Sequence, residues 1–195
     1  DTSEAADSED SEAADSSEDT TAADDTEAVR DVFAMDTYMT VKAYGPQGDA
    51  AVEAAVEEIN RLDALLSTGN EDSEVAGINA NNGGHLSEDG AVLMERSLEL
   101  YKSTGGVFDV AIYPVMKAWG FTDGNYRVPD DETLKSLLQL ADPSLIEYDS
   151  STADVNFEEK GVQIDFGGIA KGYTSSRIMD IYKEKGVTSG LVNLG

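Results

Sequence analysis

VQIDFGGIAKGY, residues 162–173, is the part of the chain from which its fold can be predicted. Apolar residues alternate with polar ones from Val162 to Phe166, which is the period of a half-buried strand. A Gly-Gly pair then breaks the strand, and residues 170–182 have the pattern of a helix. Backbone N–H groups and the positive end of that helix would meet at one concave corner, where anions are favoured.

Two side chains give this corner its chemistry. Lys171 adds a positive charge, while Asp165 and the free carbonyls of the turn could bind a hard divalent cation. The alternative is structural: a helix that starts at two glycines, with a lysine that extends to the solvent. The spacing matches neither G-x-G-x-x-G nor a P-loop, so the local pattern leaves both interpretations open.

The charge of the chain is strongly negative and uneven. The formal net charge is −27, and residues 1–29 contain twelve acidic residues and no basic one, which leaves −15 for residues 30–195. Such a field repels nucleic acids and anionic membrane surfaces, so neither is an expected partner. The chain has no cysteine and one histidine, His85, in a polar turn, which disfavours transition-metal sites and Ser-His-Asp chemistry. An oxygen-ligated magnesium or calcium ion suits this composition better.

Composition also divides the chain in two. Residues 1–30 are predicted to be a disordered acidic spacer rich in Ser, Thr, Asp and Glu, and residues 31–195 a folded domain. Such spacers are typical after the lipid-bearing residue of bacterial surface lipoproteins, although a cytoplasmic acidic tail would have the same composition. No apolar run approaches the length of a membrane span. The start at Asp1 without a methionine implies that an upstream segment was removed.

Periodicity and capping residues predict an α+β domain. Apolar alternation indicates strands at 38–44, 145–148, 154–157 and 190–194, with a hairpin turn at 158–161. Further helices are predicted at 49–66 with Asp49 as N-cap, at 73–79, at 87–104 with Ser87 as N-cap, and from Asp130 or Asp131; Gly186 is expected to cap the C-terminus of the helix from Ala170. Asp109 lies among apolar residues and must find hydrogen-bond donors if it is buried. It either caps a helix over 110–118 or has a functional role, and the pattern leaves both open.

Five motifs, taken in order along the chain, resemble those of the ApbE-type flavin transferases, the FAD:protein FMN transferase family. They are Met35-Asp36-Thr37, where the family usually has Met-Gly-Thr; Leu66-Ser67-Thr68 with Asp72-Ser73-Glu74 and Asn79; TGGVFDV at 104–110 with Pro114 and WGF at 119–121; IDFGGIAKGY at 164–173; and LVNLG at 191–195. Together they cover nearly all of residues 32–195. The resemblance implies an ApbE-like, T-fold-related mixed α/β domain.

The resemblance also implies a reaction. A threonine hydroxyl of a target flavoprotein would attack the FMN phosphorus of FAD with the help of Mg²⁺ or Mn²⁺, and AMP would leave. FAD is then the substrate and the metal ion the cofactor. By their positions in the motifs, the FAD-binding residues would be Met35, Gly69, Val107, Phe108, Asp109, Gly167, Lys171 and Tyr173. The backbone carbonyl of Ala170 would bind the metal.

Two departures from the family pattern change these expectations. Gly69 stands where several members carry an aromatic residue that packs on the flavin or adenine, which favours transient binding or hydrolysis of FAD. The family's later His and Asp-x-x-Thr-Gly segment has no counterpart, so we expect a domain truncated at its C-terminus, with catalytic residues beyond Gly195. We expect an extracytoplasmic, lipid-anchored enzyme of the cell envelope. An FAD pyrophosphatase and a non-catalytic surface flavin-binding protein are the alternatives.

Overall fold

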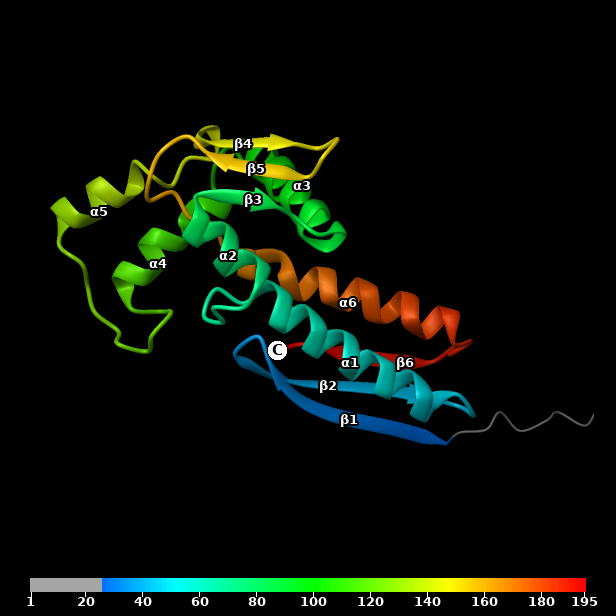
Figure 1. Ribbon diagram of the computed structural model, residues 1–195. Helices are drawn as coiled ribbons and strands as arrows, with labels where there is room; N and C mark the ends of the chain where they lie inside the picture. Colours follow the sequence, from blue (N-terminus) through cyan, green and yellow to red (C-terminus); the bar gives the residue numbers. More distant parts are fainter. Residues whose placement is uncertain (1–25) are drawn as a thin grey trace, which may run out of the picture.

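Two long helices, α1 (Gly48–Leu66) and α6 (Gly167–Glu184), lie side by side at the centre of the computed structural model, which describes residues 26–195 (Figure 1). One antiparallel sheet covers one side of this pair, and a second small sheet with helix α3 lies beyond the other side. Two clusters of buried side chains correspond to these two parts. The predicted α+β class is therefore confirmed.

The first sheet has the strand order β1-β2-β6, formed by β1 (Glu27–Ala34), β2 (Thr37–Tyr44) and β6 (Gly190–Asn193). Alternate residues of β2, namely Met39, Val41 and Ala43, are buried against α1. Strand β1 was not predicted. It begins at Glu27, before the expected domain start at residue 31, and most of the predicted spacer lies outside the described residues.

Helix α1 begins one residue earlier than predicted, and Asp49 does not cap it. Gln47 occupies the N-cap position without a side-chain hydrogen bond, and the Asp49 carboxylate instead lies 3.5 Å from the Arg30 guanidinium. Gly48 is required at the close approach to the sheet, because a Cβ there would lie 3.0 Å from the carbonyl oxygen of Ala43. The sequence pattern located the helix correctly, but its capping residue was wrong.

The second sheet has the order β3-β5-β4, from β3 (Gly83–His85), β5 (Asp154–Phe157) and β4 (Ile146–Asp149). Ser73 caps α2 (Glu74–Asn81), Ser87 caps α3 (Glu88–Ser103) and Asp130 caps α5 (Asp131–Leu138), each through its side chain. The cap predicted at Ser87 and the helix start predicted at Asp130 or Asp131 are confirmed, whereas for Ser73 only a short helix over 73–79 was predicted. The remaining elements are the short helical turns η1 (Val110–Ile112) and η2 (Pro143–Leu145) and the helix α4 (Tyr113–Trp119).

The predicted strand at 162–166 is wrong in one respect. Val162, Ile164 and Phe166 are buried as their alternation predicted, but only Val162 forms a bridge, with Lys160. Residues 163–166 form no strand, so 158–161 is not a hairpin turn between two strands. Asn79 binds Ile164 instead: its Nδ2 donates to the Ile164 carbonyl (2.9 Å), and its Oδ1 accepts from the Ile164 N–H (2.7 Å). The alternation therefore fixed which side chains are buried, while a side chain of α2 replaced the expected neighbouring strand.

The Gly-Gly pair also differs from its predicted role. Gly167 and Gly168 are the first two residues of α6 rather than a break before it. Gly186 follows the end of this helix with a φ of 76°, as predicted for its C-terminus. Among the described residues, no helix combines the length and hydrophobicity needed to cross a bilayer.

Candidate functional site

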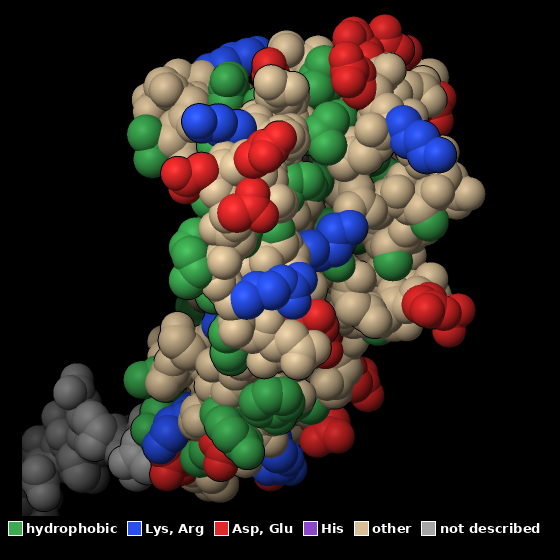
Figure 2. All heavy atoms as spheres, turned by 90° about the vertical axis from the view of Figure 1, so that its left-hand side faces the viewer, with side chains coloured by type: hydrophobic (Ala, Val, Ile, Leu, Met, Phe, Trp, Pro, Cys, Tyr) green, Lys and Arg blue, Asp and Glu red, His purple; other side chains and the backbone are tan. Residues whose placement is uncertain are grey.

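A pocket of about 290 Å³ lies at the start of α6. Four segments line it: the turn between β1 and β2 (Met35, Asp36), the end of α1 with the following loop (Asp63, Leu66, Ser67, Thr68, Gly69), α4 with its following loop (Met116, Phe121, Thr122), and the start of α6 (Asp165, Gly167, Ala170, Lys171). The turn and α4 lie at the left of Figure 1, the side that faces the viewer in Figure 2. Charges of both signs are interspersed on that face, with basic side chains across its middle.

Asp165 is the central polar group of this pocket. Its Oδ1 accepts a hydrogen bond from the Gly167 N–H at 2.7 Å, and its Oδ2 accepts one from the Thr68 hydroxyl at 3.5 Å. Burial raises the pKa of Asp165, and these two hydrogen bonds oppose the shift without cancelling it. The helix start is therefore already capped by a carboxylate, so an anionic ligand at this corner would also require a cation.

The charge of the lining leads to the same conclusion. Three carboxylates, those of Asp36, Asp63 and Asp165, line the pocket, and of the described lining residues Lys171 alone is basic. Asp63 also has a structural role, since its Oδ1 accepts the Met35 N–H at 3.0 Å. A diphosphate would enter a lining with a net negative charge, and a bound divalent cation would reverse the local sign.

The turn that supplies Met35 holds an uncommon backbone conformation. Met35 and Asp36 form a two-residue hairpin turn, and their φ angles of 48° and 58° place both in the left-handed region. This region costs free energy for residues other than glycine. Such strained backbone conformations are often found at functional sites. The bond from Met35 N–H to Asp63 holds the turn at the pocket edge.

The structure brings together five of the predicted site residues. Met35, Gly69, Gly167, Ala170 and Lys171 all line the one pocket although they come from segments far apart in the sequence. The most distant of them are joined by contacts between the first turns of α6, the end of α1 and the β1–β2 turn. This convergence follows only from the tertiary packing.

Three other predicted residues are not among those that line the pocket. Val107 is 88% exposed, and the Phe108 ring packs over Gly168, where a Cβ would lie 2.9 Å from its Cε2 atom. Asp109 caps η1, since its Oδ1 accepts from the Ala111 N–H at 2.8 Å. Burial raises the pKa of Asp109, and its capping bond opposes that shift. The predicted capping role of Asp109 is thus confirmed, and its predicted role in FAD binding stays a prediction.

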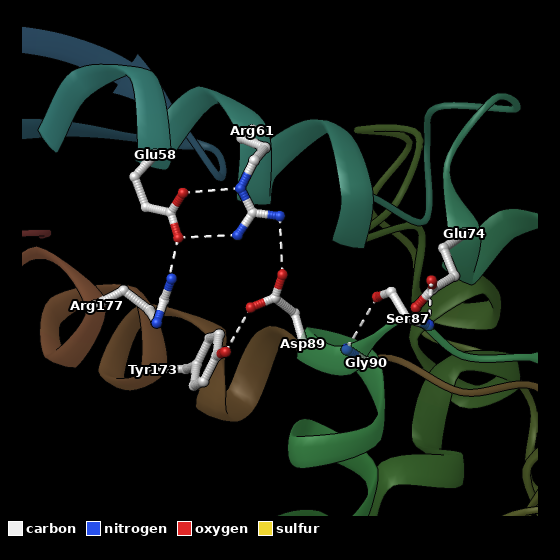
Figure 3. A network of polar contacts seen from close by, with 8 residues as sticks. All are labelled: Glu58, Arg61, Glu74, Ser87, Asp89, Gly90, Tyr173 and Arg177. Atoms are coloured by element: carbon white, nitrogen blue, oxygen red, sulfur yellow. Dashed lines mark hydrogen bonds and ion pairs between the residues drawn. The ribbon is translucent and has the colours of Figure 1, made fainter. Parts of the chain in front are cut away.

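Tyr173 does not line this pocket, and its side chain belongs to a polar network (Figure 3). Its hydroxyl donates to Asp89 Oδ1 at the start of α3, and Asp89 Oδ2 lies 2.8 Å from the Arg61 guanidinium of α1. Arg61 also binds Glu58 through two hydrogen bonds, and Arg177 of α6 donates to Glu58 at 3.2 Å. Two carboxylates and two guanidinium groups therefore link α1, α3 and α6 and orient the helix whose start forms the pocket.

This network gives a pH-dependent stability. Hydrogen bonding from Arg61 lowers the pKa of Glu58; for Asp89, burial alone would raise the pKa, but bonds from Arg61 and Tyr173 lower it. Because both folded-state pKa values lie below the unfolded ones, the network stabilises the fold above about pH 4 and is lost as the pH falls through the folded values. We expect Asp89→Asn to reduce the free energy of unfolding by about 1–3 kcal/mol at pH 7, and by less at pH 3, in denaturant titrations at both pH values.

Glu99→Gln is the matched control for that variant. Glu99 lies on the same helix and pairs with Arg96, but the two side chains are 66% and 62% exposed. Exposed pairs of this kind contribute little, so its effect is expected to stay within about 0.5 kcal/mol. Equal losses for the two variants, or a loss for Asp89→Asn that does not change with pH, would contradict the role of the network.

Several lining residues were missed as site residues in the sequence. Thr68 belongs to the Leu-Ser-Thr motif, but the sequence pattern did not predict that it lines the site. Its hydroxyl contacts Asp165. Asp63 gave no local signal, because it is one of many acidic residues on α1. His85 is on β3, where its Nδ1 lies 3.1 Å from Asp154, and it does not line the pocket.

The residues present suit a magnesium ion only in part. Within residues 26–195, no group of three or more His, Cys, Asp or Glu side chains could hold a metal. Asp165 and Ala170 both line the pocket, and the Ala170 carbonyl also accepts the Thr174 hydroxyl at 2.9 Å. Magnesium is often bound by one or two protein oxygens together with substrate phosphates and water. Two oxygens from this chain fit such a shell.

Comparison with known sequences gives a consistent result. A sequence model of the ApbE family matches residues 35–195. The FAD:protein FMN transferase of Treponema pallidum (strain Nichols) is 29% identical over 181 residues, covering 87% of this chain and 50% of that protein. The protein of the same name from Klebsiella pneumoniae (strain 342) is 28% identical over 164 residues, covering 83% and 52%. The chain therefore spans about half the length of the curated relatives it matches.

Solved structures share the fold. The ApbE protein of Thermotoga maritima superimposes with a TM-score of 0.76 at 27% identity, covering 82% of this chain and 53% of that one. The flavinyl transferase ApbE of Pseudomonas stutzeri, in its apo form, gives 0.78 at 25% identity, covering 88% and 60%. The flavin transferase ApbE of Vibrio cholerae gives 0.79 at 19% identity, covering 87% and 57%, a similarity of fold alone.

Proposed function

Because this chain belongs to the ApbE family, we propose that the protein that carries it transfers FMN from FAD to a threonine hydroxyl of a target flavoprotein and releases AMP. The observation that carries the proposal is the convergence of Met35, Gly69, Gly167, Ala170 and Lys171 on one pocket. The names of the curated relatives support the same activity.

The charges of the pocket support a diphosphate ligand bound together with a cation. Lys171 offers one positive charge, and a magnesium ion held by Asp165 and the Ala170 carbonyl would supply the rest when bound. That ion would neutralise the diphosphate. In the reaction the threonine Oγ–P bond forms, the P–O bond to AMP breaks, and AMP leaves with the electron pair.

The threonine proton must pass to a base, and no described residue of the lining is assigned to that role. We place the base, together with the remaining metal ligands, in sequence that the curated relatives have and residues 1–195 do not match. This chain alone is then expected to bind FAD weakly and to turn it over slowly or not at all.

The absence of a side chain at Gly69, which lines the pocket, favours a second candidate function. A Cβ at Gly69 would meet only the Ser67 Oγ, at 3.9 Å, so this part of the lining offers no side chain to hold a bound ring. Weaker retention of FAD fits an FAD pyrophosphatase, in which water replaces the threonine. A surface flavin-binding protein without catalysis is the third possibility, and it differs from both because it produces no AMP.

One experiment separates these three functions. The protein, at the length of its curated relatives, is incubated with FAD, Mg²⁺ and an acceptor flavoprotein domain, and both AMP and in-gel flavin fluorescence are measured. We expect a fluorescent acceptor and equimolar AMP, with no label on an acceptor whose threonine is replaced by valine. AMP without acceptor labelling would indicate the pyrophosphatase, and bound FAD without AMP the binding protein.

We also propose an extracytoplasmic location with a lipid anchor. The support is the composition of residues 1–29, which carry twelve acidic residues and no basic one and thus suit a solvated spacer between a membrane and a domain. Radiolabelled palmitate incorporation and fractionation of cells would test it, and a protein recovered unlabelled from the cytoplasm would contradict it.

A further inference from the structure

Three aromatic side chains form a stack in and after helix α4. The rings of Trp119 and Phe121 are nearly parallel, with centroids 6.3 Å apart and an interplanar angle of 12°. Tyr126 meets Phe121 edge to face at 5.9 Å. Phe121 is 58% exposed and Tyr126 74% exposed, so the stack presents much of its apolar surface to solvent. Exposed apolar surface of this kind often marks a site of binding.

The loop that carries the stack is held in place by its own backbone. Gly120 has a φ of 78°, and a Cβ there would lie 2.0 Å from the carbonyl oxygen of Asn125. The Arg127 N–H donates to the Trp119 carbonyl at 3.1 Å, and its guanidinium donates to the Lys117 carbonyl at 2.9 Å. The rings are therefore preorganised, which lowers the entropy that a ligand must overcome.

Phe121 joins this stack to the pocket. It lines the pocket together with Thr122 from the same loop, and Gly69 lines it from the loop after α1. The pocket thus has an aromatic ring in its lining and, at Gly69, a stretch of backbone without a side chain. Its volume of about 290 Å³ is at the lower end for small-molecule sites. A dinucleotide would therefore extend beyond it, past the exposed rings.

We propose that the Trp119–Phe121–Tyr126 stack is a ring-binding platform at the pocket mouth, on which Phe121 stacks against a planar ring of the dinucleotide. This inference rests on the proposed function and adds a specificity-determining residue to it. The shared chemistry is aromatic stacking, which both the isoalloxazine and the adenine ring can provide. The platform supplies the aromatic contact that Gly69 does not.

Calorimetric titration of the protein, at the length of its curated relatives, with FAD, FMN and AMP in the presence of Mg²⁺ tests the platform. Stacking contacts are worth enough that Phe121→Leu, which keeps an apolar side chain but removes the aromatic face, is expected to weaken FAD binding about tenfold. Phe121→Tyr restores the face and is expected to bind like the unaltered protein. If only FMN binding is weakened by Phe121→Leu, the flavin ring is the one that stacks; if only AMP binding is weakened, it is adenine.

Tyr44→Leu is the control for loss of a partly exposed aromatic residue. Tyr44 ends β2 at the opposite end of the sheet from the β1–β2 turn and does not line the pocket, so FAD affinity should not change. Phe121 is largely exposed, and circular dichroism and thermal unfolding will show that its variants fold.

Three results would overturn the inference, and they differ in what they imply. If the unaltered protein binds FAD and Phe121→Leu binds it equally well, the platform is wrong while the proposed function stands. An effect of Phe121→Leu on acceptor labelling alone, at unchanged FAD affinity, has the same meaning and assigns the rings to the protein acceptor. If the unaltered protein at that length binds no FAD, the assignment of the pocket fails, and the platform fails with it.

Discussion

Asn79→Ala is expected to lower the free energy of unfolding by about 2–4 kcal/mol, because it leaves two buried backbone groups without partners. The Asn79 amide makes both hydrogen bonds of Ile164, one to its carbonyl and one from its N–H. Ile164 is fully buried, so water cannot replace them. In a domain of this size the melting temperature should fall by about 4–16 °C, measured by calorimetry or circular dichroism.

The same variant should also affect the pocket. Ile164 directly precedes Asp165. The Asp165 N–H donates to the Val110 carbonyl at 2.9 Å, and the Asp165 carboxylate accepts the Gly167 N–H at the start of α6. When the anchor at Ile164 is lost, this carboxylate is held less firmly, and FAD affinity is expected to fall together with stability. Stability and binding are therefore linked through a single asparagine outside the pocket lining.

Asn81→Ala is the matched control for Asn79→Ala. Asn81 lies on the same helix, two residues later, and its side chain donates only to the Gly77 carbonyl on the exposed face. Its replacement should change the free energy of unfolding by less than about 0.5 kcal/mol. If the two alanine variants unfold alike, Asn79 does not replace a neighbouring strand for residues 162–166.

Removal of divalent cations is expected to weaken FAD binding by about tenfold or more. The effect of Asp165→Asn on FAD affinity should have opposite signs with and without the metal. Without metal, the Asp165 carboxylate repels the diphosphate, so Asp165→Asn is expected to bind FAD about fivefold more tightly in EDTA. With Mg²⁺ the carboxylate becomes a ligand, and the same variant should bind FAD more weakly than the unaltered protein. Titrations of both proteins with FAD, in EDTA and in Mg²⁺, measure the four affinities.

The stability of this variant provides an independent readout. Burial raises the folded-state pKa of Asp165, so the folded protein holds its proton more tightly than the unfolded chain. Stability is therefore lost as the pH rises from the unfolded pKa through the folded one, and at pH 7 the buried carboxylate is unfavourable. Asp165→Asn should be at least as stable as the unaltered protein at pH 7, and its advantage should disappear in acid.

Asp31→Asn serves as the control for both readouts, because Asp31 is exposed on β1 and accepts only from Thr40. It removes one negative charge without touching the pocket, so neither FAD affinity nor its dependence on Mg²⁺ should change beyond a general charge effect. An Asp165→Asn variant that binds FAD more weakly both with and without metal would show that Asp165 acts only through the shape of the pocket.

The sequence by itself determined the α+β class, the cap at Ser87, the helix start at Asp130, and the burial of Val162, Ile164 and Phe166. Each of these depends on neighbours within a few positions, through periodicity or a side chain that reaches the next turn. The order of the motifs likewise identified the family, because motif order is a property of the chain and not of its packing.

Only the tertiary structure decided how these pieces meet. Asn79 holds Ile164 from 85 positions away, and Tyr173 turns from the expected ligand site toward Asp89, 84 positions away. The Asp165 carboxylate accepts the Gly167 N–H at the start of α6. An anion is therefore expected to bind at this helix start only together with a cation. Such contacts depend on which helices pack together, and local propensity carries no information about partners so distant in the chain.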